Sequence, residues 1–475
     1  MMMFFNIGEW QRYIALNKKE IINPAHPRAP MFTKRQIWAL LIPLMIEQLL
    51  NSLMGTVDTM MVSNAGSAAI SAVSLVDAIN VLLINVFAAM ATGGTIICAQ
   101  YLGRKERGEA VETGRQLILT VILISTVVML VCTLLRGPLL GLIFGRVEVE
   151  VMENAKAYLL ITALSYPFIA TYNAGAALFR VDGNSRLPML ISLVCNLINI
   201  AGNAVLIFGF RMGVVGAALA TLLSRVLSAL AVMYFLRLPR QTIVIRDYFR
   251  IRPKPARILN IMAVGIPTGI ENGMFHFGKL VIQSSVSTLG TTAIAAHAMT
   301  TTLELVTGQA PMGIGLGMMT LVGQCMGAGR EDEARQNIKR LTLYAEIVLA
   351  ASCALMALLV RPITVLGGME PAAADMAVWM TYIINVVKPL IWTLSFIPAY
   401  GMRAAGDVRF SMTVSSCTMW LCRVVMTVLL IRAFHFGPIA VWIGMFSDWA
   451  VRALIFSLRF RSGKWARKKV LRDAA

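Results

Sequence analysis

Charged residues are scarce in this chain of 475 residues. Asp, Glu, Lys and Arg together make up 14% of the sequence, against about 25% in an ordinary soluble domain. Hydrophobic residues make up 57%, which leaves too few polar residues to cover the surfaces of the roughly three soluble domains, of about 150 residues each, that this length suggests. The composition therefore excludes a soluble enzyme and indicates a membrane protein.

Sequence motifs of catalysis and nucleotide hydrolysis are also missing. The chain has no GxxxxGK[ST], so nothing in it supports transport driven by ATP. It contains neither GxSxG nor HExxH, and we therefore expect no enzymatic activity and no cofactor. The seven cysteines form no CxxC pair and no zinc-type spacing, which predicts that they are small buried apolar residues.

Long hydrophobic runs are abundant. A helix needs about 20 mostly apolar residues to span a bilayer, and twelve such runs can be placed. Because twelve is even, both termini lie on one side of the membrane. The predicted spans cover residues 37–62, 68–97, 114–135, 157–179, 187–209, 214–236, 258–285, 292–322, 341–360, 377–401, 410–431 and 438–458.

Positive charge is unevenly distributed over the connections. The chain has 43 Lys and Arg against 24 Asp and Glu, a net charge of +19. The termini and the even-numbered connections carry 32 Lys and Arg, whereas the odd-numbered connections carry 6. Short cytoplasmic loops are rich in positive charge, so the bias predicts that both termini are cytoplasmic. The charge then serves membrane topology and attraction to anionic headgroups, and we expect no nucleic-acid partner.

The sequence contains an internal repeat. A shift of 224 residues aligns Pro43 with Pro267 and Glu47 with Glu271, and the register continues through the first two spans of each copy. Later pairs are Gln100 with Gln324, Gly103 with Gly327 and, at a shift of 223, Arg180 with Arg403. Each copy has six spans and therefore the same orientation, an arrangement typical of transporters that rock two halves about a central cavity.

We therefore predict an all-α polytopic membrane protein with twelve transmembrane helices in two parallel six-helix repeats around a central cavity. The linker between the repeats is basic and contains three prolines, which suits a flexible connection. The predicted divisions are a cytoplasmic N-terminal segment (1–36), an N-lobe (37–236), a cytoplasmic linker (237–257), a C-lobe (258–458) and a basic cytoplasmic tail (459–475).

Charged side chains inside the bilayer cost at least about 2.5 kcal/mol each, so they are functional candidates. Glu47 and Glu271 each follow a proline by four residues in the first span of their repeat, which predicts equal depth. They either stabilise the kink at that proline or line the cavity and attract a cationic substrate. Further candidates for the substrate cavity, all in the C-lobe, are Lys279, His297, Glu304 and Lys388. A lone histidine inside the membrane, such as His297, is more often a hydrogen-bonded structural residue than a proton carrier.

Asp58 departs from the repeat, because its counterpart is Ile282. A rise of about 1.5 Å per residue puts Asp58 about 34 Å above the cytoplasmic start of its span. By the same rise, Asn203 lies about 26 Å above the cytoplasmic start of its span. Thr221 lies about 15 Å below the external end of its span. With Asn199, one turn from Asn203, these side chains can meet at one level. Such a pocket can hold a proton on Asp58 or an oxygen-coordinated Na⁺, and a structural hydrogen-bond network is the alternative.

Several stretches resemble the MATE family of multidrug and toxic compound extrusion transporters, over residues 34–460. Each is weak alone, but their order on twelve spans is specific. They are Pro43 with Thr56-Val57-Asp58-Thr59 and Gly66; Ala99-Gln100-Tyr101-Leu102-Gly103; Gly213 with Gly216-Ala217-Ala218-Leu219-Ala220-Thr221; Ala295-Ala296-His297; and Gly401-Met402-Arg403-Ala404-Ala405-Gly406-Asp407.

The resemblance implies a secondary active antiporter that exports amphipathic, cationic compounds in exchange for H⁺ or Na⁺. Asp58 matches the first-span aspartate of the family, and Asn199, Asn203 and Thr221 match an Asn, Asp and Thr of archaeal and related bacterial members. Asn203 thus replaces an acid, and this favours protons over Na⁺. Another branch relies on acids of the C-terminal half, a role open to Glu271. We expect a monomer in the bacterial inner membrane, whose partners are the lipid bilayer and a small-molecule substrate.

A flippase for lipid-linked sugars, from the same superfamily, is the alternative function. Cavities of such proteins tend to be rich in Arg and Lys for pyrophosphate, and Lys279 and Lys388 are central positive residues here. Dye accumulation in whole cells separates the two functions, because an exporter lowers it in a protonophore-sensitive way and a flippase does not.

Overall fold

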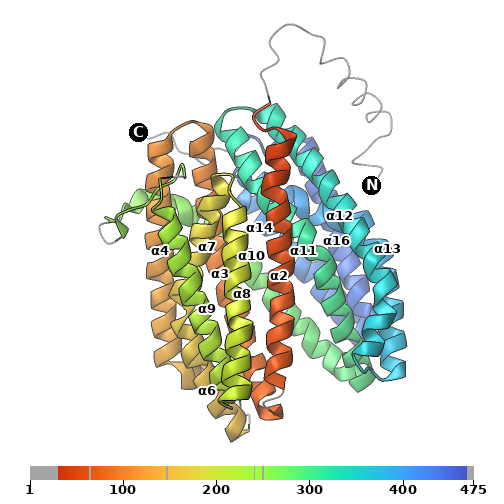
Figure 1. The fold of residues 1–475 in the computed structure, drawn as a ribbon. Coiled ribbons are helices and arrows are strands. Elements are labelled where there is room, and N and C mark those ends of the chain that lie inside the picture. Colours follow the sequence, from red (N-terminus) through yellow and green to blue (C-terminus); the bar gives the residue numbers. More distant parts are fainter. Residues whose placement is uncertain (1–29, 64–65, 146–147, 240, 249–250, 468–475) are drawn as a thin grey trace.

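The computed structural model describes residues 30–63, 66–145, 148–239, 241–248 and 251–467. The greater parts of the predicted N-terminal segment (1–29) and of the tail (468–475) lie outside the described residues. Within the described residues the secondary structure is helical, and the helices form one bundle (Figure 1). Helix α2 begins and helix α16 ends at the same end of this bundle, which we call the terminal end; the opposite end is the far end.

The N-lobe contains the first six spans. Its helices are α2 (Lys34–Ser63), α3 (Ser67–Gly103), α4 (Arg107–Leu134), α5 (Arg136–Phe144), α6 (Val149–Leu164), α7 (Tyr166–Val181), α8 (Arg186–Asn203) with the π-helical segment η2 (Ala204–Gly209), and α9 (Gly213–Leu236).

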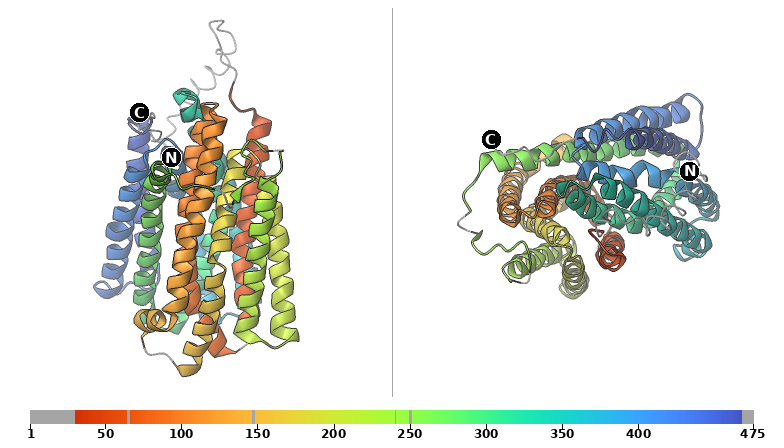
Figure 2. Two further views of the ribbon diagram at one scale, coloured as in Figure 1. Left: turned by 90° about the vertical axis from the view of Figure 1, so that its left-hand side faces the viewer. Right: turned by 90° about the horizontal axis from the view of Figure 1, so that it is seen from above.

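The C-lobe repeats this arrangement, and the right-hand view of Figure 2 shows the two groups of helices from above. Its helices are α10 (Pro255–Val286), the 3₁₀ turn η4 (Ser287–Leu289), α11 (Thr291–Gly327), α12 (Glu331–Leu366), α13 (Pro371–Ala404), α14 (Val408–Thr418) with the π-helical segment η5 (Met419–Val425) and α15 (Met426–Arg432), and α16 (Ile439–Arg461).

Ten helices among the described residues are long and apolar enough to cross a membrane. Two predicted spans are not among them. The span at 157–179 is divided at Ser165 into α6 and α7, of 16 residues each, and the span at 258–285 is α10, whose sequence carries Glu271 and Lys279. Every predicted span corresponds to one helix or one helix run, so the predicted fold class is confirmed.

The first helix of each lobe packs against the second helix of the other lobe. Helix α2 packs on α11, and α10 packs on α3. Leu41 and Leu44 of α2 belong to the same apolar core as Ile314 and Met318 of α11. This reciprocal exchange follows the sequence repeat, and it means that a movement of α2 is felt directly by the C-lobe.

A pair of glutamines joins the lobes at the terminal end. The Nε2 atom of Gln100 donates a hydrogen bond to the backbone carbonyl of Ala404 at 2.8 Å. The Nε2 atom of Gln324 donates to the carbonyl of Val181 at 2.7 Å. Both bonds reach the last turn of a helix in the other lobe, where backbone carbonyls lack partners within the helix. The repeat thus forms two equivalent inter-lobe contacts.

A pair of glycines lets the same helices approach closely. A Cβ atom on Gly103 would collide with the backbone carbonyl of Gln324, and a Cβ atom on Gly327 would collide with that of Gln100. Glycine is therefore required at both positions for this packing. With the glutamine contacts, the glycine crossing closes the terminal end between the lobes.

The described part of the linker differs from the flexible connection that its prolines suggest. Ile243 and Ile245 are buried against the N-lobe, and the backbone N–H of Thr242 donates to Asp182 at 2.8 Å. The hydroxyl of Tyr248 donates to the carbonyl of Met233, and burial raises the pKa of Tyr248 to about 12. The alternating isoleucines anchor this segment to the lobe. The domain boundaries themselves stay a prediction.

Five of the seven cysteines are buried, as predicted. Cys417 is exposed and Cys422 is partly exposed. Both lie at the C-lobe helix run formed by α14 and η5, a run with exposed apolar residues such as Leu421. An apolar side chain on the outside of a membrane bundle faces lipid, so burial within the protein is not needed there.

Candidate functional site

A central cavity of about 480 Å³ lies between the two lobes. Its size suits a small-molecule ligand. Helices α2, α3 and α7 of the N-lobe and α10, α11, α13, α14 and α16 of the C-lobe contribute to its wall. Polar and charged residues in the wall include Glu47, Asn51, Asn85, Arg180, Glu271, His276, Lys279, Gln309, Arg403 and Arg452.

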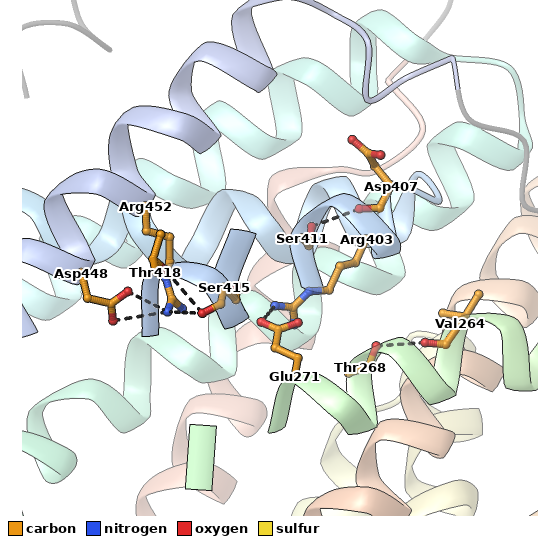
Figure 3. A network of polar contacts seen from close by, with 10 residues as sticks. All are labelled: Val264, Thr268, Glu271, Arg403, Asp407, Ser411, Ser415, Thr418, Asp448 and Arg452. Atoms are coloured by element: carbon orange, nitrogen blue, oxygen red, sulfur yellow. Dashed lines mark hydrogen bonds and ion pairs between the residues drawn. The ribbon is translucent and has the colours of Figure 1, made fainter. Parts of the chain in front are cut away.

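The two repeat-related glutamates lie in the cavity wall, and each is paired with an arginine. An Oε1–Nη2 distance of 2.7 Å joins Glu47 to Arg180, and one of 2.6 Å joins Glu271 to Arg403 (Figure 3). Both arginines belong to the last turn of a helix, α7 or α13. The arginine neutralises each carboxylate, so neither acid offers a free negative charge to a cationic substrate in this state.

We expect Glu271→Ala to lower the stability of the protein, because Arg403, whose side chain is 13% exposed, is left without a counterion. Breaking a buried pair in this way costs about 3–5 kcal/mol. The apparent melting temperature of the detergent-solubilised protein should fall by several degrees, and adding Arg403→Ala should recover part of the loss. Glu153→Ala is the control, because its pair with Lys156 is exposed and worth at most about 1 kcal/mol. Equal losses in Glu271→Ala and Glu153→Ala would contradict this reasoning.

The four residues predicted for ion coupling come together in the N-lobe, and we call them the N-lobe pocket. The Nδ2 atom of Asn203 donates to Oδ1 of Asp58 at 2.7 Å. With its amide oriented to suit its neighbours, Asn199 donates to the same oxygen at 2.8 Å and accepts from Thr221 Oγ1 at 3.3 Å. The Oδ1 atom of Asn203 is buried, and no hydrogen-bond partner for it is found in the described part of the chain. The pocket therefore contains one carboxylate that accepts two amide donors.

The helix geometry changes at this pocket. Helix α8 ends at Asn203, and the π-helical segment η2 follows directly. Such segments leave backbone groups less regularly paired and occur frequently at functional sites. The equivalent run of the C-lobe also contains a π-helical segment, η5.

A second buried polar network lies beside the N-lobe pocket. Asp77 accepts hydrogen bonds from Asn80 at 3.1 Å and from Tyr158 at 3.3 Å. Arg225 donates to the hydroxyl of Ser165 at 2.7 Å, at the break between α6 and α7. Asp77 and Arg225 both act electrostatically on the carboxylate of the N-lobe pocket. The sequence offered one signal for them, because both are charged residues within predicted spans.

Three C-lobe residues predicted for the cavity lie elsewhere in that lobe. Lys388, fully buried, pairs with Glu304 at 2.7 Å and donates to Thr307 at 2.9 Å. The ring of His297 packs against Trp442, with 5.8 Å between centroids. None of the three predicted residues is among those that line the cavity. Glu304 and Lys388 pair with each other between α11 and α13, away from the cavity wall.

Lys279 is predicted to line the cavity, and it does so without an acidic partner among the described residues. It lies in the cavity wall, and its ammonium group is 4.9 Å from the ring centroid of Phe275, a cation–π contact. Among the described residues, no carboxylate forms an ion pair with it. Within the described part of the chain, the cavity wall therefore carries one cation, Lys279, that no carboxylate neutralises.

Comparison with known families gives a match over most of the chain. The family profile described as MatE matches residues 43–205 and 267–429. These two matches begin and end 224 residues apart, the same offset that relates the two halves of the sequence.

Two curated relatives cover most of the chain. A probable multidrug resistance protein NorM of Thermotoga maritima is 26% identical over 450 residues, 92% of this chain and 94% of the relative. A FAD transporter of Shewanella oneidensis is 24% identical over 384 residues, 79% of this chain and 82% of the relative.

A solved structure shares the fold. A crystal structure of MATE in complex with MaD3S superposes with a TM-score of 0.84 at 20% sequence identity, and the match covers 90% of this chain and 95% of that one. The similarity extends over both lobes, in agreement with the twelve-span fold.

Proposed function

Because the chain belongs to the MATE family of transporters, we propose that it is a secondary active antiporter that exports small amphipathic molecules in exchange for protons. Members of this family are transporters and not enzymes, so the chain is a multi-pass membrane transporter that handles a small molecule in a lipid environment. We further propose that it acts as a monomer in the bacterial inner membrane, with no nucleic-acid partner and no cofactor.

The hydrogen bonds on Asp58 carry the proposal of proton coupling. Oδ1 of this carboxylate faces the amide N–H groups of Asn199 and Asn203. An amide N–H is a donor and repels a metal cation, whereas it stabilises a carboxylate anion. A proton can be taken up on the other carboxylate oxygen without displacing these donors. Na⁺ would need several oxygen ligands at the same place, so this arrangement supports protons over Na⁺.

Helix α2 offers a physical route from the proton to the cavity. It carries Asp58 of the N-lobe pocket and Glu47 of the cavity wall, and it packs on α11 of the other lobe. Protonation removes the charge of Asp58 and weakens the bonds from its amide partners. A shift of α2 then alters the inter-lobe contact. Proton and substrate would each favour one of two states, which is the requirement for exchange.

The substrate is proposed as an amphipathic drug or metabolite. Among the relatives, one is a probable multidrug resistance protein and another a FAD transporter. The cationic substrate expected from Glu47 and Glu271 loses support, because arginines pair with both acids. The flippase alternative loses one of its two positive residues, because Lys388 is enclosed by Glu304 and Thr307.

The test of export is dye efflux from cells that express the chain. We would load rhodamine 6G, rhodamine B and carboxyfluorescein, and follow their loss with and without a protonophore. Export predicts faster loss of at least one dye than in cells with the empty vector, and the protonophore should abolish the difference. Unchanged loss of all three dyes at normal expression would contradict the proposal.

The proposed orientation places the terminal end in the cytoplasm. A membrane-impermeant maleimide added to intact cells should leave Asp247→Cys in the linker unlabelled and should label Glu148→Cys at the far end. Both positions are exposed, and the background is Cys417→Ser, because Cys417 is the exposed cysteine. Labelling of Asp247→Cys from outside would reverse the orientation.

A further inference from the structure

Four cationic side chains of the cavity wall differ in how they are neutralised. Three of them have a carboxylate partner: Arg180 pairs with Glu47 at 2.7 Å, Arg403 with Glu271 at 2.6 Å and Arg452 with Asp448 at 3.0 Å. The fourth is Lys279, which has none among the residues that the structure describes. Since both acids in the wall are already paired, the wall carries an excess of one positive charge at Lys279.

The surroundings of Lys279 add to this positive charge. Arg423 is buried, and its guanidinium lies 5.4 Å from the ring centroid of Phe275, the same ring that Lys279 contacts. The acid that acts electrostatically on Lys279 is Glu304, and Lys388 holds that acid at 2.7 Å. The protein therefore places two cations about one aromatic ring and commits the nearby carboxylate to another lysine.

The repeat shows that this charge belongs to one lobe. At the shift of 224 residues, Lys279 of α10 corresponds to Gly55 of α2, and Asp58 of α2 corresponds to Ile282 of α10. Helix α2 of the N-lobe thus has an acid, Asp58, at a position where α10 of the C-lobe has Ile282. Helix α10 has a base, Lys279, one turn before Ile282. The first helices of the two lobes therefore carry opposite charges at positions one turn apart in the repeat register.

Hydrogen-bonding groups adjoin the lysine in the wall. The Nδ2 atom of Asn85 in the N-lobe lies 3.1 Å from Nε2 of His276 in the C-lobe, and this contact joins the two lobes. His276 precedes Lys279 by one helical turn. Asn272, a further residue of the wall, donates to the backbone carbonyl of Asn85 at 3.4 Å. The ring of Phe275 provides an apolar surface beside the ammonium group. A cation, amides and an aromatic face together suit a planar molecule that carries an acidic group.

We propose that Lys279 binds an anionic group of the substrate, a carboxylate or a phosphate, so that the preferred substrates are amphipathic anions or zwitterions. The inference rests on the proposed export function. An ammonium group without a counterion attracts an anion and repels a cation in a site partly shielded from water. Selection by charge then resides in the C-lobe, apart from the N-lobe pocket that is proposed to carry the proton.

The test uses three xanthene dyes that differ in charge. Rhodamine 6G is a cation, rhodamine B a zwitterion with a carboxylate, and 5-carboxyfluorescein an anion. Their transport would be measured in proteoliposomes under an imposed pH gradient, for wild type, Lys279→Gln, Lys279→Arg and the exposed control Lys339→Gln. Size-exclusion profiles confirm folding. The wild-type selectivity is a second measurement that needs no variant.

We expect wild type to transport at least one carboxylate dye about tenfold faster than rhodamine 6G. Lys279→Gln should lose this preference, Lys279→Arg should retain most of it because the charge remains, and Lys339→Gln should behave as wild type. Dye transport with the same selectivity in wild type and Lys279→Gln would overturn the inference and leave the export function standing. Absence of transport of all three dyes by wild type would overturn the export function, and the inference with it.

Discussion

Asp58→Asn is expected to reduce proton-driven efflux by at least about a hundredfold while leaving insertion and abundance near the wild-type level. The amide has the shape of the protonated carboxyl group but cannot release a proton. In the structure the carboxylate accepts donors from Asn203 at 2.7 Å and from Asn199 at 2.8 Å. The substitution removes the charge that holds those donors, so the N-lobe pocket stays in its proton-loaded arrangement, and the exchange cycle stops.

The measurement is dye efflux from cells and from proteoliposomes, with abundance determined by immunoblot. The control is Asp247→Asn, a change of the same chemistry at an exposed linker position, which should transport as wild type does. Undiminished efflux by Asp58→Asn at normal abundance would remove Asp58 from the coupling mechanism.

Gly103→Ala has the second largest expected effect, a loss of efflux of about tenfold or more. A single methyl group at this position would meet the backbone carbonyl of Gln324 in the other lobe. The protein would therefore disfavour the state in which the terminal end is closed, and alternating access needs that state. Reduced transport at a normal expression level would indicate a conformational defect and not a folding defect.

Gly108→Ala is the matched control. Gly108 belongs to α4, near the same end of the bundle, and a Cβ atom there would meet nothing within 4 Å. Alanine is favoured over glycine in a helix by about 1 kcal/mol, so this variant should be as active and as stable as wild type. If Gly103→Ala transported as well as Gly108→Ala, the glycine crossing would not be part of the transport cycle.

The architecture could be predicted from the sequence because its signals are local or periodic. Hydrophobic length identifies each span, and the repeat relates the lobes. The grouping of residues in the N-lobe pocket could also be predicted. Depth follows from counting residues along a helix, and Asp58, Asn203 and Thr221 fall at one level by that count. The hydrogen bond between Asp58 and Asn203 agrees with the predicted proximity.

The partners of the other charged residues could not be predicted, because depth alone does not say which helices are neighbours. Glu47 and Arg180 are 133 positions apart, and the sequence gives no sign that α2 and α7 bring them together. Glu304 and Lys388 are 84 positions apart. The sequence alone predicts that both line the cavity, because it does not show that they contact each other. Lateral packing of helices decides which charges remain free, and this is why Lys279 becomes conspicuous only in the structure.

Export is proposed to be driven by a proton gradient through Asp58, and efflux from proteoliposomes under separately imposed gradients distinguishes this coupling from coupling to Na⁺. Purified wild type and Asp58→Asn would be reconstituted with rhodamine B or carboxyfluorescein, and efflux followed under a pH gradient without Na⁺, and under a Na⁺ gradient with the pH clamped. Proton coupling through Asp58 requires efflux by wild type under the pH gradient alone, and none above background by Asp58→Asn. Efflux that follows the Na⁺ gradient at clamped pH, or equal efflux by the two proteins, would contradict it.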